Sequence, residues 1–241
     1  MSKYFLIFFV FFCASGQKIS ERKIKKWINQ ISVFDKSHVG IRVEGVNKIY
    51  IDYNGSKYMT PASNTKLFTF LAAVQTFDSL PALEYKIEND SVISFRSTAY
   101  PLLLHPFYSD STLLNFLSQK KSWKYSKPKN MVKPYGPGWA WDDYNFYYSA
   151  EKSVFPIYGN TVKYIIGHNP VPKFSFELDS SINNVQRSKI ENKFYYNPNT
   201  LKGTDTLYRP FITSDSLFVN LLLRVTNNNI IDNNKNDSLG W

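Results

Sequence analysis

The chain has 241 residues, of which 43% are hydrophobic and 17% are aromatic, a composition that supplies a folded core and excludes a wholly disordered protein. The formal net charge of +10 suits a nucleic acid, an anionic polymer of the cell envelope or simply a basic surface. No RNP-like motif, zinc knuckle or helix-turn-helix pattern supports the first of these, so we expect no nucleic acid partner.

The first 16 residues have the features of a secretory signal peptide. Lys3 is followed by an unbroken apolar run over residues 4–13, which is too short to span a bilayer as a mature helix. Residues 14–16 (Ala-Ser-Gly) then offer small side chains for cleavage before Gln17. We therefore predict a signal peptide and a periplasmic or secreted protein; an uncleaved membrane anchor is the alternative.

Cleavage at this point would remove Cys13, the only cysteine of the chain. The mature protein would then have neither disulfides nor thiolate chemistry, as is typical of many bacterial periplasmic enzymes. No later segment reaches the length of a transmembrane helix, so we expect no stable membrane span after cleavage.

The next part of the chain alternates between helical and strand patterns. Apolar residues recur at helical spacing over residues 19–31, and residues 38–44 and 48–53 have the pattern of two strands joined as a hairpin. A second helix is expected to begin at Pro61, because proline at the first helical position loses no hydrogen bond. Residues 78–81 end it.

From residue 82 onward the pattern changes to short β-prone runs separated by Pro, Gly and Asn. Helical spacing returns over residues 111–119 and 214–224, and Ser214 is a plausible N-cap of the latter helix. The predicted strands cover residues 83–87, 91–95, 153–157, 161–166 and 173–178. The sequence therefore predicts a β-rich region that forms a body of its own.

Ser63 and Lys66 are the strongest candidates for catalytic residues. A serine hydroxyl is a poor nucleophile until a base accepts its proton. Three residues along a helix amount to about one turn, so the Lys66 amine should lie beside the Ser63 oxygen. Backbone N–H groups at a helix start also favour developing negative charge and disfavour a protonated lysine.

The Ser-x-x-Lys pattern has little specificity by itself, because it occurs five more times in this lysine-rich chain. The other pairs begin at Ser15, Ser20, Ser118, Ser126 and Ser149. We expect only Ser63 to lie just inside a helix start, after a hairpin and ahead of an apolar helix face. The alternative is an ordinary helix N-terminus with a solvated lysine.

Four longer stretches add to the Ser-x-x-Lys pattern. Residues 61–69 read PASNTKLFT, residues 138–143 read GWAWDD and residues 148–153 read YSAEKS. Residues 205–216 read DTLYRPFITSDS. Residues 61–69 resemble the nucleophile segment of one family, and residues 138–143 and 148–153 together resemble the signature of its inserted domain. Residues 205–216 resemble the return to the catalytic domain of the same family. It is the D-alanyl-D-alanine carboxypeptidase/endopeptidase family, low-molecular-mass penicillin-binding proteins with a large inserted domain, in which S-x-x-K is a motif.

The resemblance implies an α+β fold, in which a partial β-lactamase/transpeptidase-like lobe carries an inserted β-rich domain. The expected parts are the signal peptide (1–16), the N-terminal part of the catalytic domain (17–80) and the inserted domain (81–205). Residues 206–241 would begin the return to the catalytic domain, truncated at the end of the chain.

The resemblance also implies a serine acyl-transfer mechanism. Ser63 would attack the D-Ala–D-Ala carbonyl of a peptidoglycan stem peptide, with Lys66 as the base and the Ser63 N–H as one oxyanion donor. β-Lactams would be covalent inhibitors of such an enzyme. Neither a metal nor an organic cofactor is expected.

Two further elements of the family, S-x-N and K-[ST]-G, are not found where they are expected. The chain has no K-[ST]-G, and Ser181-Ile182-Asn183 fits S-x-N only by its letters, inside the inserted domain. We therefore expect this sequence to be an N-terminal portion, either a fragment or the product of a truncated gene. The alternative is an inactive, cell-wall-associated pseudoenzyme or peptidoglycan-binding protein.

Other chemistries have weaker support in the sequence. His38, His105 and His168 are isolated and no H-E-x-x-H pattern is present, so a zinc site is not expected. The pair Asp142-Asp143 is expected in a turn or cap rather than in acid/base catalysis. The aromatic residues between 135 and 148 could stack on sugar rings, but we expect them to form a buried cluster.

Overall fold

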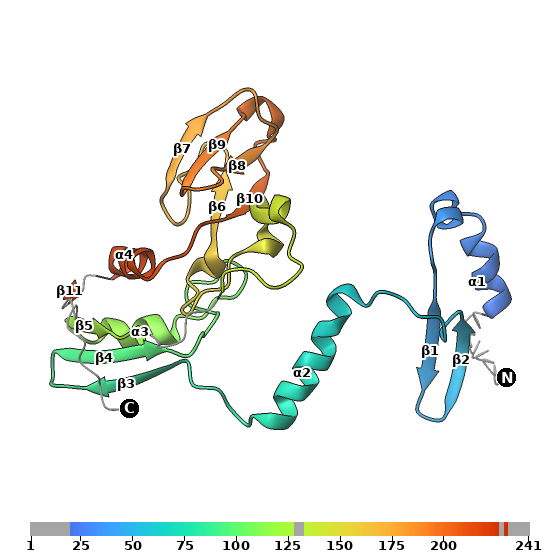
Figure 1. Cartoon of the computed structure of the whole chain (residues 1–241), viewed down its shortest axis with the longest axis horizontal. Helices are drawn as coiled ribbons and strands as arrows, with labels where there is room; N and C mark the ends of the chain where they lie inside the picture. The colour runs from blue at the N-terminus through green and yellow to red at the C-terminus, as the bar shows by residue number, and fades with distance from the viewer. Residues whose placement is uncertain (1–19, 128–132, 227–228, 231–241) are drawn as a thin grey trace, which may run out of the picture. The chain divides into compact units, whose positions relative to one another are not determined.

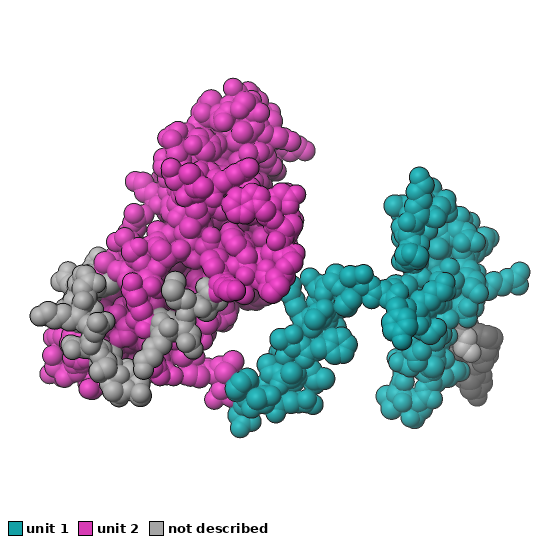
Figure 2. All heavy atoms as spheres, viewed as in Figure 1, with its two compact units in different colours: residues 1–78 teal, residues 79–241 magenta. Residues whose placement is uncertain are grey.

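The structure is a computed structural model that describes residues 20–127, 133–226 and 229–230 (Figure 1). The chain divides into two compact units, residues 1–78 and residues 79–241 (Figure 2). The predicted signal peptide lies outside the described residues. None of the helices within the described ranges is both long and apolar enough to cross a membrane.

The first unit contains two α-helices and a β-hairpin. Helix α1 spans Glu21–Ile28, and its start is capped by the Ser20 side chain. Strands β1 (Ile41–Gly45) and β2 (Lys48–Tyr53) pair antiparallel, which confirms the predicted hairpin. Helix α1 packs against β2, and a short 3-10 helix, Ser32–Lys36, connects α1 to β1.

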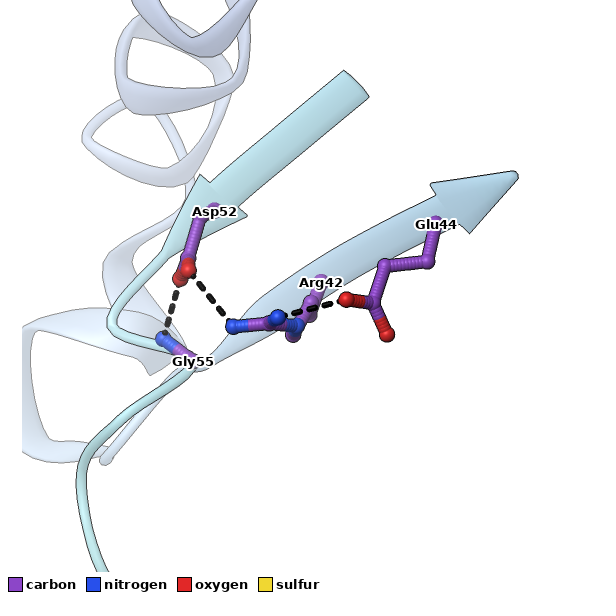
Figure 3. Close-up of polar contacts among 4 residues, drawn as sticks. All are labelled: Arg42, Glu44, Asp52 and Gly55. Atoms are coloured by element: carbon purple, nitrogen blue, oxygen red, sulfur yellow. Dashed lines mark hydrogen bonds and ion pairs between the residues drawn. The ribbon is translucent and has the colours of Figure 1, made fainter. Parts of the chain in front are cut away.

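A group of polar contacts ties the end of the hairpin together (Figure 3). Arg42 and Asp52 face each other across the two strands, and Arg42 Nη1 lies 2.9 Å from Asp52 Oδ2. The other terminal nitrogen of Arg42 lies 2.5 Å from Glu44 Oε1. The backbone N–H of Gly55 donates to Asp52 Oδ1 at 3.0 Å. Because all these side chains are exposed, the contacts fix local geometry more than they add stability.

The second unit is built on a four-stranded sheet with the order β11-β5-β4-β3. Strands β3 (Leu83–Ile87) and β4 (Val92–Ser97) form an antiparallel pair, and β5 (Ser122–Tyr125) runs parallel to β4. Parallel neighbours need a crossover, which helix α3 (Thr112–Ser118) supplies. The short strand β11, Asn229–Ile230, pairs with β5.

Two smaller sheets follow along the chain. Strands β6 (Thr161–Ile165) and β10 (Thr206–Pro210) pair antiparallel. Strand β9 (Lys193–Tyr196) lies between β7 (Ser175–Leu178) and β8 (Val185–Arg187). Helix α4, Asp215–Val225, follows β10 along the chain. The Ser214 side chain accepts a hydrogen bond from Leu217 N at 3.1 Å, which confirms Ser214 as the N-cap of α4. Short 3-10 helices span Trp141–Asn145, Tyr147–Ser149, Tyr158–Asn160 and Pro198–Thr200.

The core of the second unit joins the four-stranded sheet to α3 and α4. Phe95 of β4 and Trp123 of β5 are fully buried, with their rings edge-on at 6.2 Å between centroids. The indole N–H of Trp123 donates to the Leu117 carbonyl at 3.0 Å, so this buried polar group is satisfied. Phe155 stacks on Phe218 of α4 at 4.4 Å. One continuous core therefore holds these elements in place.

One predicted strand, over residues 153–157, is wrong. These residues form an irregular segment in which Phe155 and Ile157 are buried. Their apolar character reflects burial in the core of the second unit, which a loop can achieve as well as a strand. The expected domain divisions at residues 80 and 205 stay a prediction, because compactness alone does not separate a catalytic from an inserted domain.

Candidate active site

The segment that carries Ser63 forms a tight turn before a longer helix. A 3-10 turn spans Ala62–Asn64, and helix α2 continues over Thr65–Thr76. The expected α-helical start at Pro61 therefore lies four residues too early. Ala62 has a φ of 45°, in the left-handed region that side chains other than glycine rarely adopt. Such strained residues recur at functional sites.

Local hydrogen bonds hold this turn. Asn64 N donates to the Pro61 carbonyl at 2.9 Å, and Thr65 Oγ1 donates to the Ala62 carbonyl at 2.9 Å. These two bonds close the turn ahead of α2. The turn thus positions the Ser63 side chain at the entrance to α2.

Ser63 and Lys66 lie together, one turn apart. Lys66 Nζ donates to Ser63 Oγ at 3.4 Å, and both side chains are exposed. In this arrangement an amine in its neutral form can accept the hydroxyl proton directly. The sequence predicted this contact between Ser63 and Lys66.

Helix α2 exposes apolar residues around most of its circumference. None of its residues is buried, and Leu67, Phe68 and Phe70 are 68%, 72% and 69% exposed. Leu71 and Val74 are also more than half exposed. A helix that is apolar on all sides normally lies inside a protein. The surroundings of the Ser63–Lys66 pair are therefore open in this chain.

Another serine of this pattern also lies at a helix start. Ser20 is the N-cap of α1, and its pair partner Lys23 lies in the first turn of that helix. The two pairs nevertheless differ in their contacts. Ser20 Oγ accepts a hydrogen bond from Lys23 N at 3.4 Å, and Lys23 Nζ lies over the Trp27 ring at 5.2 Å. Here the hydroxyl caps the helix and the ammonium faces an aromatic ring.

Two other Ser-x-x-Lys pairs lie in unsuitable places. Ser118 is the last residue of α3, and its hydroxyl donates to the Leu114 carbonyl at 2.8 Å. Ser149 is 4% exposed and belongs to a 3-10 turn. Within the described part of the chain, Ser63 is the serine of this pattern whose hydroxyl is bonded to the side-chain nitrogen of its own lysine.

The histidines and the acidic pair do not form a catalytic group. His105 Nδ1 accepts a hydrogen bond from Phe107 N at 3.2 Å, and burial lowers the pKa of His105. Asp142 and Asp143 lie in the first turn of the 3-10 helix Trp141–Asn145, and Asp143 accepts from the Tyr148 hydroxyl at 3.0 Å. This position favours the predicted turn role.

The prediction of a buried aromatic cluster between residues 135 and 148 is wrong. Trp141, Tyr147 and Tyr148 are 63%, 58% and 59% exposed. The segment folds as two consecutive 3-10 turns, which direct neighbouring side chains outward rather than onto one buried face. Phe146 and Tyr148 stack on each other instead, with ring centroids 5.4 Å apart.

A buried polar cluster in the second unit was not predicted. Glu151 Oε2 accepts from Thr213 N at 2.7 Å and from Thr213 Oγ1 at 2.8 Å, and Glu151 Oε1 accepts from the Tyr135 hydroxyl at 3.2 Å. Arg187 is only 3% exposed and lies over the Tyr144 ring at 5.3 Å. Burial lowers the pKa of Arg187. No sequence pattern joins these residues, because they are distant along the chain.

Comparisons with known proteins concern the part of the chain that contains this site. Residues 20–115, which include Ser63 and Lys66, match the model of the D-Ala-D-Ala carboxypeptidase 3 (S13) family. The predicted family resemblance is confirmed. No curated protein matches the sequence.

A solved structure shows the same kind of fold. It is the crystal structure of penicillin binding protein 4 (dacB) from Haemophilus influenzae, with a TM-score of 0.50 and 19% sequence identity. The alignment covers 77% of this chain and 50% of that chain, so this chain spans about half the length of its structural relative. The mixed helices and sheets described above are the predicted α+β class.

Proposed function

We propose that this chain carries the nucleophile of a serine-type D-Ala-D-Ala carboxypeptidase/endopeptidase that acts on peptidoglycan stem peptides. The single observation that carries the proposal is the 3.4 Å contact between Lys66 Nζ and Ser63 Oγ. It lies inside the segment that matches the S13 family model. None of the other serine–lysine pairs described above has this contact.

In this proposal, Ser63 Oγ attacks the carbonyl carbon between the two terminal D-alanines while Lys66, as the base, accepts its proton. The tetrahedral intermediate collapses to an acyl-enzyme, and the terminal D-alanine leaves after its nitrogen is protonated. Water then hydrolyses the ester and frees the shortened stem peptide. The Ser63 N–H would donate to the oxyanion. A polypeptide that covers α2 would supply the remaining substrate contacts.

The predicted export would bring the protein to the compartment that contains the proposed substrate. A protein released by cleavage before Gln17 would reach the periplasm or the cell exterior, where peptidoglycan lies. β-Lactams mimic the D-Ala–D-Ala terminus and would acylate the same Ser63 oxygen. The basic composition, with a net charge of +10, suits an anionic envelope polymer.

A pseudoenzyme that binds the cell wall without turnover is the second candidate. The observation in its favour is that these 241 residues contain no K-[ST]-G sequence. The two candidates differ in turnover and not in location, so an assay of product release separates them.

The test measures free D-alanine released from a disaccharide pentapeptide by the protein as its own cells produce it. Three alleles are compared: wild type, Ser63→Ala and the matched control Ser20→Ala. We expect release by the wild type and by Ser20→Ala, and none by Ser63→Ala. Release that persists in Ser63→Ala would refute the assignment of the nucleophile, and no release by the wild type would favour the pseudoenzyme.

A further inference from the structure

The second unit contains a cavity of about 290 Å³ that lies beside the start of α4. The apolar part of its lining consists of buried core residues, chiefly Phe155, Phe211 and Phe218. Neither Ser63 nor Lys66 lines it. The volume approaches the lower limit of typical small-molecule sites, so the cavity suits a ligand of one or two amino acids.

Two neighbouring residues of the cavity lining offer hydrogen-bond donors. Lys152 lines it with an exposed side chain, and within the described ranges its ammonium has no carboxylate partner. The neighbouring Ser153 hydroxyl accepts from Asn160 Nδ2 at 2.9 Å, which leaves its own hydrogen available to a ligand. These two adjacent residues can therefore donate to a carboxylate.

Another part of the lining offers a carboxylate. Asp215 Oδ1 accepts from the Tyr125 hydroxyl at 3.4 Å, and Asp215 Oδ2 lies 3.5 Å from Lys127 Nζ. Both contacts are long, and the Lys127 side chain is 72% exposed. An ionised carboxylate has about four acceptor positions, so Asp215 retains capacity for an amino group.

We propose that this cavity binds a short zwitterionic peptide. Its carboxylate would pair with Lys152 and the Ser153 hydroxyl, and its amino group would pair with Asp215 beside Tyr125. An apolar side chain of the peptide would cover the Phe155–Phe218 pair, whose stacked rings belong to the apolar part of the lining. This proposal does not depend on the proposed function.

The experiment is calorimetric titration of the full chain with alanylphenylalanine and two capped analogues. N-acetyl-alanylphenylalanine lacks the ammonium group, and alanylphenylalaninamide lacks the carboxylate. For the parent dipeptide we expect a Kd of about 10⁻⁴–10⁻³ M, as for a small ligand with few contacts. Blocking either the amino group or the carboxylate of the dipeptide should weaken binding about five- to tenfold, the value of one charge-assisted contact at a partly open site.

Two variants test which residue binds the carboxylate of the dipeptide and which residue binds its amino group. Lys152→Met should weaken the dipeptide about five- to tenfold and leave the affinity for the amide unchanged. Asp215→Asn should weaken the dipeptide by the same factor and leave the affinity for the N-acetyl analogue unchanged. Lys202→Met, which changes an exposed lysine outside the cavity, should behave as the wild type. Urea unfolding of each variant confirms that the second unit remains folded.

The proposal is overturned if alanylphenylalanine does not bind at about 10 mM, a concentration well above the expected Kd. It is also overturned if the N-acetyl analogue and the amide both bind as tightly as the parent dipeptide. Weakening of all three ligands alike by Lys152→Met or Asp215→Asn would assign those residues a structural role and would equally refute it.

Discussion

Lys66 Nζ lies 3.4 Å from Ser63 Oγ, one turn along the start of α2. The left-handed conformation of Ala62 and the bonds of the 3-10 turn set the direction of the Ser63 side chain. The turn thus brings the predicted nucleophile and the predicted base into contact.

Lys66→Ala should slow acylation by fluorescent penicillin about 10²–10⁴-fold, the usual effect of removing a positioned general base. The rate is measured on the protein as its own cells produce it. Lys23→Ala is the matched control, because Lys23 belongs to the other pair at a helix start. Equal rates for Lys66→Ala and wild type would mean that another group accepts the Ser63 proton.

Phe95→Ala should lower the free energy of unfolding of the second unit by about 3–5 kcal/mol, because it leaves a cavity beside Trp123 in the core. Phe107→Ala is the matched control. Phe107 is 56% exposed, and its loss should cost less than about 1 kcal/mol. Urea unfolding followed by circular dichroism gives both values. Similar losses for the two variants would contradict the described core.

Glu88 should make the second unit less stable in acid. Hydrogen bonds from Lys124, at 2.7 Å, and from the Ser94 hydroxyl, at 2.5 Å, lower the pKa of Glu88 below its ordinary value of 4.5. The ionised carboxylate therefore stabilises the fold above pH 4.5, and this contribution is lost as the pH falls through the lower folded-state pKa.

Glu88→Gln should accordingly reduce the free energy of unfolding at neutral pH and have little effect below the folded-state pKa. Urea titrations at several pH values measure this difference, with the exposed Glu191→Gln as a control. A difference between wild type and Glu88→Gln that grows toward acid pH would have the wrong sign for this account.

The exposed apolar surface of α2 should bind a hydrophobic dye. Phe68→Ser combined with Phe70→Ser should reduce the fluorescence of bound dye, because these two rings are 72% and 69% exposed. The free energy of unfolding should change by less than about 0.5 kcal/mol, since neither ring is buried. Thr76→Ser on the same helix is the control. Unchanged dye binding in the double variant would show that α2 is covered in solution.

Local elements of this fold were predictable because their signals are local. Alternation of side chains marked the hairpin, and Ser214 marked the start of α4. The β-prone composition of residues 153–157 wrongly predicted a strand, because the apolar residues of this segment belong to a buried loop. Strand β8, Val185–Arg187, has only three residues, which is too few to show a periodicity.

The candidate site was predictable to a similar degree. Helical spacing alone places Lys66 beside Ser63, and the 3.4 Å contact between their side chains follows from it. The cavity near α4 was not predictable, because its residues are separated by long stretches of chain and meet only through tertiary packing. The exposure of Trp141 and Tyr147 was also missed, since their aromatic character predicts burial but their tight turns prevent it.

The most direct test of the central claim is to locate the β-lactam adduct by peptide mass spectrometry. The protein is taken from its own cells, treated with benzylpenicillin and digested. The account predicts one penicilloyl group on the Ser63 oxygen and no adduct in Ser63→Ala. An adduct on any other serine, or one that persists in Ser63→Ala, would contradict it.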